Sequence, residues 1–171
     1  EFVFDDGGAS YSETFTRAGR IQTGYTTGLG QVLTADYDME GNVTARSNSV
    51  GPVASYGYDA LGRRTSIHDG AGDEVLGLGY DGRGNVTSRA WNSGATVTYE
   101  YDDRGLIASA TDSSGAVSTY AHDAEGRLTQ LAVFEPDQTS VDGNSVAEQT
   151  VEYTYDGINR VTEVSNDHAT K

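Results

Sequence analysis

The sequence of 171 residues contains no cysteine, two prolines, and 11 basic residues against 26 acidic ones. Without cysteine the chain can form neither a disulfide nor a thiolate metal site. The formal net charge of −15 argues against nucleic-acid binding, because binding to phosphates requires lysine and arginine to displace counterions. The chain has no run of about 18 apolar residues, so we predict no membrane insertion.

Glycine and tyrosine are the residues that stand out in what remains. The chain has 22 glycines, and its 11 tyrosines outnumber its 4 phenylalanines. Tyrosine, valine and threonine recur in order along the sequence, and β-branched and aromatic residues suit the pleated surface of a sheet. The composition favours an all-β chain with many turns and does not suggest an enzyme.

A short motif recurs along the chain: Tyr-Asp-x-x-Gly, then Arg or Asn, an aliphatic residue and often Thr. It starts near residues 15, 37, 58, 80, 101, 122 and 155, and the copy near 15 is degenerate. The starts are 21 or 22 residues apart, except that the last two are 33 apart because a longer loop around 135–149 intervenes. The predicted structural anchors are the aromatic residue, the Asp, and the Gly or Asn of six copies: Tyr37, Asp38, Gly41, Tyr58, Asp59, Gly62, Tyr80, Asp81, Gly84, Tyr101, Asp102, Gly105, His122, Asp123, Gly126, Tyr155, Asp156 and Asn159.

Each copy is predicted to be a β-hairpin. Val97, Tyr99 and Tyr101 alternate with polar residues, which is the period of a strand. An Asp followed three residues later by Gly fits a type I turn with a residue of positive φ, and Asn159 supports this because Asn is the next-best residue in that conformation. A looser polar turn then leads to the next unit. We therefore expect one array of about seven hairpins over residues 1–171.

At this spacing the motif resembles the YD repeat of the Rhs family, which includes bacterial Rhs toxins, shell subunits of insecticidal toxin complexes, and teneurins. The resemblance covers roughly residues 15–171. It implies an all-β fold of tandem antiparallel hairpins that forms a spiralling β-ribbon or shell segment. It also implies a secreted or cell-surface protein, of bacterial origin. No copy of the family's closing core domain is recognisable.

Two function hypotheses follow. The first is a structural scaffold segment of a shell, which in the family is often a hollow casing around a toxin. Its partners are neighbouring YD repeats of the same polypeptide or further copies of the chain. The second is a secreted or surface fibre that binds a glycan or protein ligand, with Trp91 as its best stacking residue. Neither hypothesis involves catalysis, a cofactor or a metal.

Three motifs suggest other chemistry, and the repeat explains each of them better. Residues 77–82 match G-x-G-x-x-G, but the motif lies across a strand and a turn rather than at a helix N-terminus. Residues 36–47 match the start of a calcium loop, but Ser47 stands where that loop needs a bidentate Glu. The three histidines, His68, His122 and His168, lie in different repeat contexts without metal or catalytic spacing.

The two ends of the sequence lack the polar caps that repeat arrays need. Glu1-Phe2-Val3-Phe4 has neither an initiator methionine nor a basic stretch, and it alternates in a way that suits pairing with a preceding strand. Residues 161–164 begin a return strand. We interpret the chain as a processed product or an excised segment that is not a compact, free-standing monomer.

Overall fold

The computed structural model describes residues 2–5, 10–18, 21–27, 31–136 and 147–168. The described residues form strands joined by turns. None lies in a helix with the length and apolar character that crossing a membrane requires. The strands are β1 (Phe2–Asp5), β2 (Ser10–Ala18), β3 (Ile21–Thr26), β4 (Val32–Tyr37), β5 (Val43–Asn48), β6 (Gly51–Tyr58), β7 (Arg64–Asp69), β8 (Glu74–Tyr80), β9 (Val86–Trp91), β10 (Thr96–Tyr101), β11 (Ile107–Asp112), β12 (Val117–His122), β13 (Leu128–Phe134), β14 (Gln149–Tyr155) and β15 (Val161–His168).

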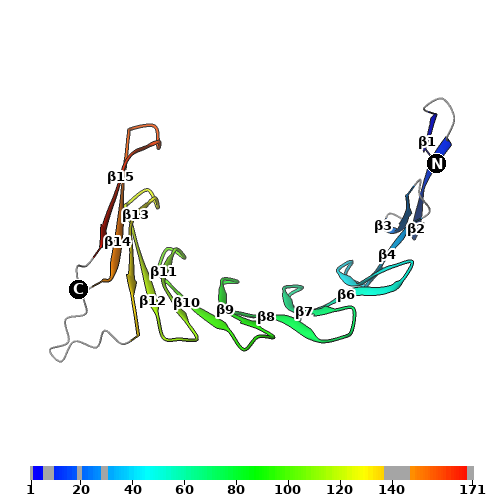
Figure 1. Ribbon diagram of the computed structural model, residues 1–171, viewed down its shortest axis with the longest axis horizontal. Coiled ribbons are helices and arrows are strands. Elements are labelled where there is room, and N and C mark those ends of the chain that lie inside the picture. Colours follow the sequence, from blue (N-terminus) through cyan, green and yellow to red (C-terminus); the bar gives the residue numbers. More distant parts are fainter. Residues whose placement is uncertain (1, 6–9, 19–20, 28–30, 137–146, 169–171) are drawn as a thin grey trace. The chain divides into compact units, whose positions relative to one another are not determined.

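The chain divides into two compact units, residues 1–78 and 79–171, and the division falls within β8. In the first unit β1 to β8 pair with one another in chain order, and every pair is antiparallel. In the second unit β9 to β15 do the same. Figure 1 shows the successive hairpins of each unit side by side. The predicted all-β fold of tandem antiparallel hairpins is confirmed.

Strand alternation gives the sheet two unlike faces. Along β10 the side chains of Val97, Tyr99 and Tyr101 are half-buried, whereas those between them are exposed. The register pairs Tyr99 with Ala110 and Tyr101 with Ile107 on β11, so small and aliphatic residues continue the same face. We call the side of the sheet that carries these tyrosines the tyrosine face. On β10 and β11 it is the more apolar side, and the opposite side carries Thr98, Glu100, Ser109 and Thr111.

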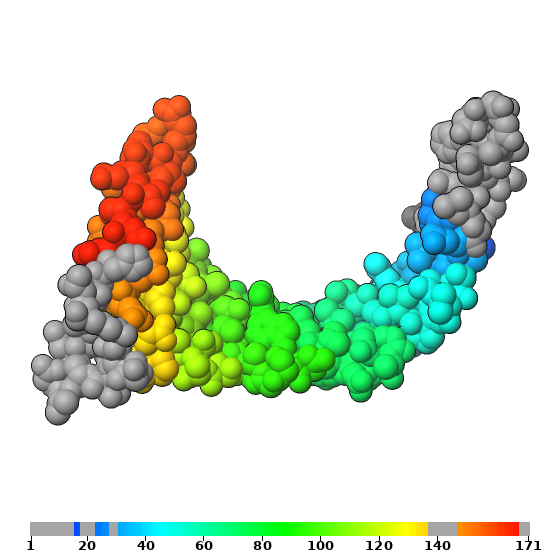
Figure 2. Space-filling view, viewed as in Figure 1, coloured from blue at the N-terminus to red at the C-terminus, as the bar shows by residue number. Residues whose placement is uncertain are grey.

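The described residues hold almost no interior core. Ala132 is their one buried hydrophobic side chain, at 6% exposure, and no large side chain is fully buried. In Figure 2 the atoms of β9 to β11, drawn in green, form a surface over which no other segment lies on the side in view.

The structure adds detail at the N-terminal stretch and at the predicted loop. β1 pairs with β2, the strand that follows it, through Phe2↔Glu13 to Asp5↔Ser10, and the expected pairing with a preceding strand stays a prediction. The degenerate first copy spans the end of β2 and the start of β3, and its residues 19–20 lie outside the described residues. The loop predicted around 135–149 separates β13 from β14, and its residues 137–146 also lie outside them.

The predicted turn conformation is confirmed at all six anchors that were expected to have positive φ. The φ angles lie between 66° and 96° at Gly41, Gly62, Gly84, Gly105, Gly126 and Asn159. A side chain in this region meets its own backbone, which explains why Gly or Asn occupies the position. In the turn of Asp81, by contrast, Gly82 is not among the positive-φ residues.

Gly84→Ala and Gly82→Ala are expected to change stability in opposite directions. A Cβ at either position meets no atom within 4 Å, so only backbone conformation distinguishes them. Gly84→Ala places alanine in the left-handed region and should lower the free energy of unfolding by about 1–2 kcal/mol. Gly82→Ala restricts the unfolded chain and should raise it by up to about 1 kcal/mol. Urea unfolding of both variants checks this, and equal effects would contradict the turn assignment.

Candidate functional site

The recurring feature of the structure is the turn that each anchor Asp opens. In the copy at Asp102, the backbone N–H of Asp102 donates to the carbonyl of Leu106 at 2.8 Å, and Gly105 N–H donates to the carbonyl of Asp102 at 2.9 Å. The carboxylate oxygen Oδ1 of Asp102 accepts from the N–H groups of Arg104 at 2.9 Å and Leu106 at 2.8 Å. One carboxylate oxygen thus satisfies two backbone donors that the turn would leave unpaired.

The same backbone pair recurs at the other anchor aspartates. In each copy the Asp N–H donates to the carbonyl four residues on, and the residue three positions on donates back to the Asp carbonyl. This holds at Asp38, Asp59, Asp81, Asp123 and Asp156. In all five, Asp Oδ1 also accepts the N–H of the residue four positions on, at 2.7–3.0 Å. The anchors that the sequence identified therefore form one repeated local structure.

The second carboxylate oxygen has a donor that sequence reasoning missed. In five copies the side chain four positions after the Asp reaches Oδ2: Asn42 and Asn85 through Nδ2 at 2.9 Å, and Arg63, Arg127 and Arg160 through Nε at 2.6–2.7 Å. The Asp102 copy has Leu106 there, and Arg104 donates to Oδ2 instead, at 3.2 Å. The choice of Asn or Arg after the Gly was visible in the motif. The structure shows that this side chain donates to the second carboxylate oxygen of the turn.

These contacts stabilise the charged form of each carboxylate. Hydrogen bonds from Asn42, Arg63 and Asn85 lower the pKa values of Asp38, Asp59 and Asp81. Backbone hydrogen bonds from Leu106 and Arg160 are the main causes of the lowered pKa values of Asp102 and Asp156. At Asp123 desolvation is the largest single influence and raises the pKa, but the hydrogen bonds and charge of Arg127, with the backbone hydrogen bond of Glu125, lower it overall.

Three of the anchor tyrosines join their hairpin to the one before it. The Tyr101 hydroxyl donates to the carbonyl of Val86 at 2.8 Å, although the paired residues of β9 and β10 extend only as far as Ser88↔Thr98. The hydroxyls of Tyr58 and Tyr155 do the same to the carbonyls of Val43 and Leu128, at 2.8 and 2.7 Å. Each of these hydroxyls therefore donates to a carbonyl that lies beyond the last paired residues of the two strands between the hairpins.

A bulge on the return strand follows each of these turns and sets the direction of the anchor side chain. Tyr101 pairs with Ile107 whereas Glu100 pairs with Ser109, so the return strand carries one extra residue. The same shift occurs at Tyr37, Tyr58 and Tyr155. His122 lies in the same register opposite Leu128, as expected of a residue that stands in the tyrosine position.

Arginines link successive turns in the second unit. Arg83 Nη1 donates to the carbonyl of Asp103 at 3.2 Å, and Arg104 Nη1 donates to that of Asp123 at 2.7 Å. Arg127 Nη1 reaches Asn159 Oδ1 at 2.8 Å, and its guanidinium lies over the ring of Tyr155, 4.7 Å from the centroid. Each guanidinium thus contacts the turn of the following hairpin, a set of contacts that we call the arginine relay.

The turns at the other ends of the strands were predicted to be looser, and this prediction is wrong at three of them. Asp69, Trp91 and Asp112 open turns with the same pair of backbone hydrogen bonds as the anchor turns. Their glycines, Gly72, Gly94 and Gly115, have positive φ. The turn at Asn48 differs, since Asn48 Oδ1 accepts from the N–H groups of Val50 and Gly51.

The motifs that the sequence analysis set aside lie in different strands and turns of the described part of the chain. Gly77 and Gly79 lie in β8, and Gly82 lies in a turn. Asp38, within the calcium-like stretch, already accepts from Asn42. His68 lies 3.8 Å from Glu74. Among the described residues no three metal-ligating side chains gather.

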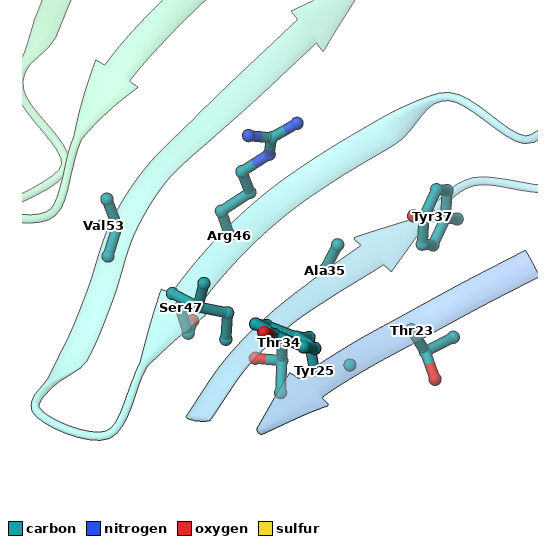
Figure 3. Close-up of a pocket in the computed structure, with 10 residues that line it drawn as sticks. Thr23, Tyr25, Thr34, Ala35, Tyr37, Arg46, Ser47 and Val53 are labelled. Carbon is teal, nitrogen blue, oxygen red and sulfur yellow. The ribbon is translucent and has the colours of Figure 1, made fainter. Parts of the chain in front are cut away.

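A shallow groove of about 770 Å³ lies in the first unit. Tyr25 from β3, Tyr37 from β4 and Arg46 from β5 line it, with Thr34 and Ser47 supplying hydroxyls (Figure 3). The groove is open to solvent, and aromatic rings, hydroxyls and one guanidinium line it.

Comparison with known proteins gives a family and a fold. The RHS Repeat family model matches residues 37–74, 80–117 and 101–133, which together make up more than half of the chain. The crystal structure of TcdB2-TccC3 is similar, with a TM-score of 0.74 and 16% identity over 95% of this chain. That of TcdB2-TccC3-Cdc42 has a TM-score of 0.52 and 16% identity over 91% of it. This chain spans 10% of the length of each. No curated protein matches the sequence.

Tyr101→Phe is expected to destabilise the second unit, whereas Tyr99→Phe is not. Tyr101→Phe removes the hydroxyl that donates to the Val86 carbonyl, and it should lower the free energy of unfolding by about 1 kcal/mol. Tyr99 lies on the same strand and face, and its hydroxyl has no acceptor among the described residues, so Tyr99→Phe is the matched control. Chemical denaturation of the two variants checks this, and equal losses would refute the role given to the anchor hydroxyl.

Acid should loosen the turns through their carboxylates. The folded-state pKa values of the anchor aspartates are lowered, so their contribution is fully present above the unfolded-state pKa of about 3.9. It is lost as the pH falls through the lowered folded-state values. Thermal unfolding midpoints should therefore fall steeply below about pH 4, and carbon-detected NMR titration should place these carboxyls below unfolded aspartate. A midpoint that stays constant in acid would contradict the arrangement.

Proposed function

This chain belongs to the RHS repeat family, and on that premise we propose that it is a non-enzymatic scaffold segment in the wall of a repeat-built shell. The observation that carries the proposal is how the recurring polar groups are used. The anchor carboxylates bind their own turns, the hydroxyls of Tyr58, Tyr101 and Tyr155 bind the preceding hairpin, and arginines bind the next turn. Because these recurring residues stabilise turns and join neighbouring hairpins, they indicate a structural role.

The exposed side chains support a wall segment that packs against neighbouring segments. Among the described residues Ala132 is the one buried hydrophobic side chain, whereas larger ones such as Val32 and Val164 are exposed. The tyrosine face carries the apolar side chains that such a wall would turn towards a partner. We propose that residues 1–171 form one array of about seven hairpins, and that its partners are neighbouring repeats or further copies of the chain.

The family resemblance supports the finer parts of the proposal. In the family such shells often surround a toxin. We propose that this wall segment also helps to enclose a toxin, in a secreted or cell-surface bacterial protein. The net charge of −15 agrees with a wall that does not adsorb nucleic acid.

An adhesive fibre is the second candidate, and two observations favour it. Trp91 is 37% exposed at the start of a turn, and the groove of the first unit presents Tyr25 and Tyr37 beside Arg46. Aromatic rings with nearby hydroxyls suit a glycan or protein ligand. A fibre and a shell differ in size distribution, since a fibre is open-ended whereas a closed shell has one mass.

Sedimentation velocity over a concentration series tests the scaffold proposal. We expect the purified chain to associate through its strand edges and tyrosine face, and to bind a hydrophobic dye such as ANS. In the longer polypeptide that completes the shell, a single mass and loss of dye binding are expected. A sharp, concentration-independent monomer that binds no dye would contradict the proposal, and an open-ended distribution in the completed polypeptide would favour the fibre.

A further inference from the structure

The groove of the first unit contains an arginine that makes no contact with an acidic or aromatic side chain. Arg46 lies in β5, and the register places Ala35 on one side of it and Ala54 on the other. Both neighbours are small and uncharged. Arg46 is exposed, and among the described residues its side chain has no hydrogen bond, ion pair or ring contact. In Figure 3 its guanidinium stands clear of the other labelled side chains.

The equivalent arginine of the second unit shows how Arg46 differs. Arg89 occupies the same place in its own repeat, nine residues after the anchor tyrosine. Its guanidinium lies over the ring of Tyr99, 5.4 Å from the centroid. The counterpart of Tyr99 in the first unit is Tyr56, and there Arg64 lies over the ring, at 4.4 Å. Because another arginine takes that ring, the guanidinium of Arg46 stays available to a ligand.

The strands that form the groove carry little negative charge, although the net charge of the chain is −15. β3 to β6 contain one acidic residue, Asp36. Alternation along β4 places Asp36 on the face opposite Ala35 and Tyr37, which line the groove. Asp38 follows Tyr37, but its carboxylate accepts from Asn42 within its own turn. The groove therefore presents a positive charge and favours an anionic ligand.

The rest of the groove lining is largely apolar. Leu33 is 49% exposed and Val53 is 46% exposed, and the rings of Tyr25 and Tyr37 line the same groove. Covering aliphatic side chains is favourable when the ligand brings apolar surface of its own, which a sugar with its many hydroxyls offers less of. The volume of about 770 Å³ is in the range of ligand sites. A ligand that fits combines a negative charge with hydrophobic groups.

The strands beneath the groove are paired on both sides. β4 pairs with β3 and β5, and β5 pairs with β4 and β6. Their backbone groups already bond to one another, so a ligand cannot join the sheet as an added strand here. Recognition must come from the side chains that line the groove.

We infer that the groove binds a peptide segment in which an acidic residue is flanked by hydrophobic ones. The carboxylate of the peptide pairs with the Arg46 guanidinium, whose planar fork can donate two parallel hydrogen bonds. The hydrophobic side chains of the peptide pack on Leu33, Val53 and the two tyrosine rings. This inference rests on the second candidate function, for which it names the ligand class, and it goes beyond the scaffold function, which requires no ligand.

Isothermal titration calorimetry of the whole chain with two capped peptides tests the inference. The peptides are Gly-Leu-Glu-Phe-Gly and the same sequence with Gln in place of Glu. We expect the Glu peptide to bind about tenfold more tightly, because the Gln peptide lacks the charge-assisted hydrogen bonds to the guanidinium. Arg46→Gln should abolish this preference, so that both peptides bind equally weakly.

Two further variants separate the charge of Arg46 from other effects. Arg17→Gln removes the same charge from the first unit at a residue that does not line the groove, and it should leave the tenfold preference intact. Val53→Thr replaces a methyl group of the lining by a hydroxyl. It should weaken the binding of both peptides alike, because they share the same hydrophobic side chains.

The outcomes distinguish this inference from the functions proposed above. Equal binding of the two peptides to the unaltered chain, or a preference that survives Arg46→Gln, would overturn the role of Arg46. Digalacturonate, an acidic disaccharide without hydrophobic side chains, is the other probe, and binding as tight as that of the Glu peptide would overturn the assignment of a peptide ligand. A chain that binds none of these probes would overturn the inference as a whole. The scaffold and the fibre would then still be decided by their size distributions.

Discussion

The structure depends on a carboxylate that binds backbone N–H groups within its own turn. In each anchor turn one aspartate oxygen accepts the N–H of the residue directly before the return strand, as Asp102 does with Leu106. This bond fixes where the strand reverses and where the extra residue of the bulge lies. The bulge in turn sets the direction of the anchor tyrosine, whose hydroxyl reaches the preceding hairpin. Contacts between repeats therefore depend on a bond within each repeat.

A chain without an interior core obtains its order from such contacts. With Ala132 as the one buried hydrophobic side chain among the described residues, burial contributes less here than in a layered domain. The free energy of unfolding is then close to the sum of the stabilities of the single hairpins and of the interfaces between neighbouring hairpins, as in other repeat proteins. This explains why tyrosine outnumbers phenylalanine, since a tyrosine on the sheet offers both an apolar ring and a hydroxyl for the next repeat.

The sequence predicted the parts of the fold that are local. Spacing and alternation gave the hairpins, and the Asp-x-x-Gly motif gave the positive φ at Gly105 and at Asn159, because both follow from the conformational limits of single residues. The hydrogen bonds that arginines make between repeats were not predicted. The donation from Arg104 to the Asp123 carbonyl joins residues 19 positions apart, and no local rule selects that partner. The second set of turns was underestimated because Trp91 opens one of them without a carboxylate.

Amide hydrogen exchange in an Asp102→Ala variant tests the central claim most directly. Alanine removes the acceptor of the Leu106 and Arg104 N–H groups while leaving Gly105 in place. If the carboxylate sets the register, protection should fall along the whole of β10 and β11 and at the ends of β9 and β12 that face them. Loss of protection confined to residues 103–106, with the strands unchanged, would show that strand pairing determines the turn and would contradict the account.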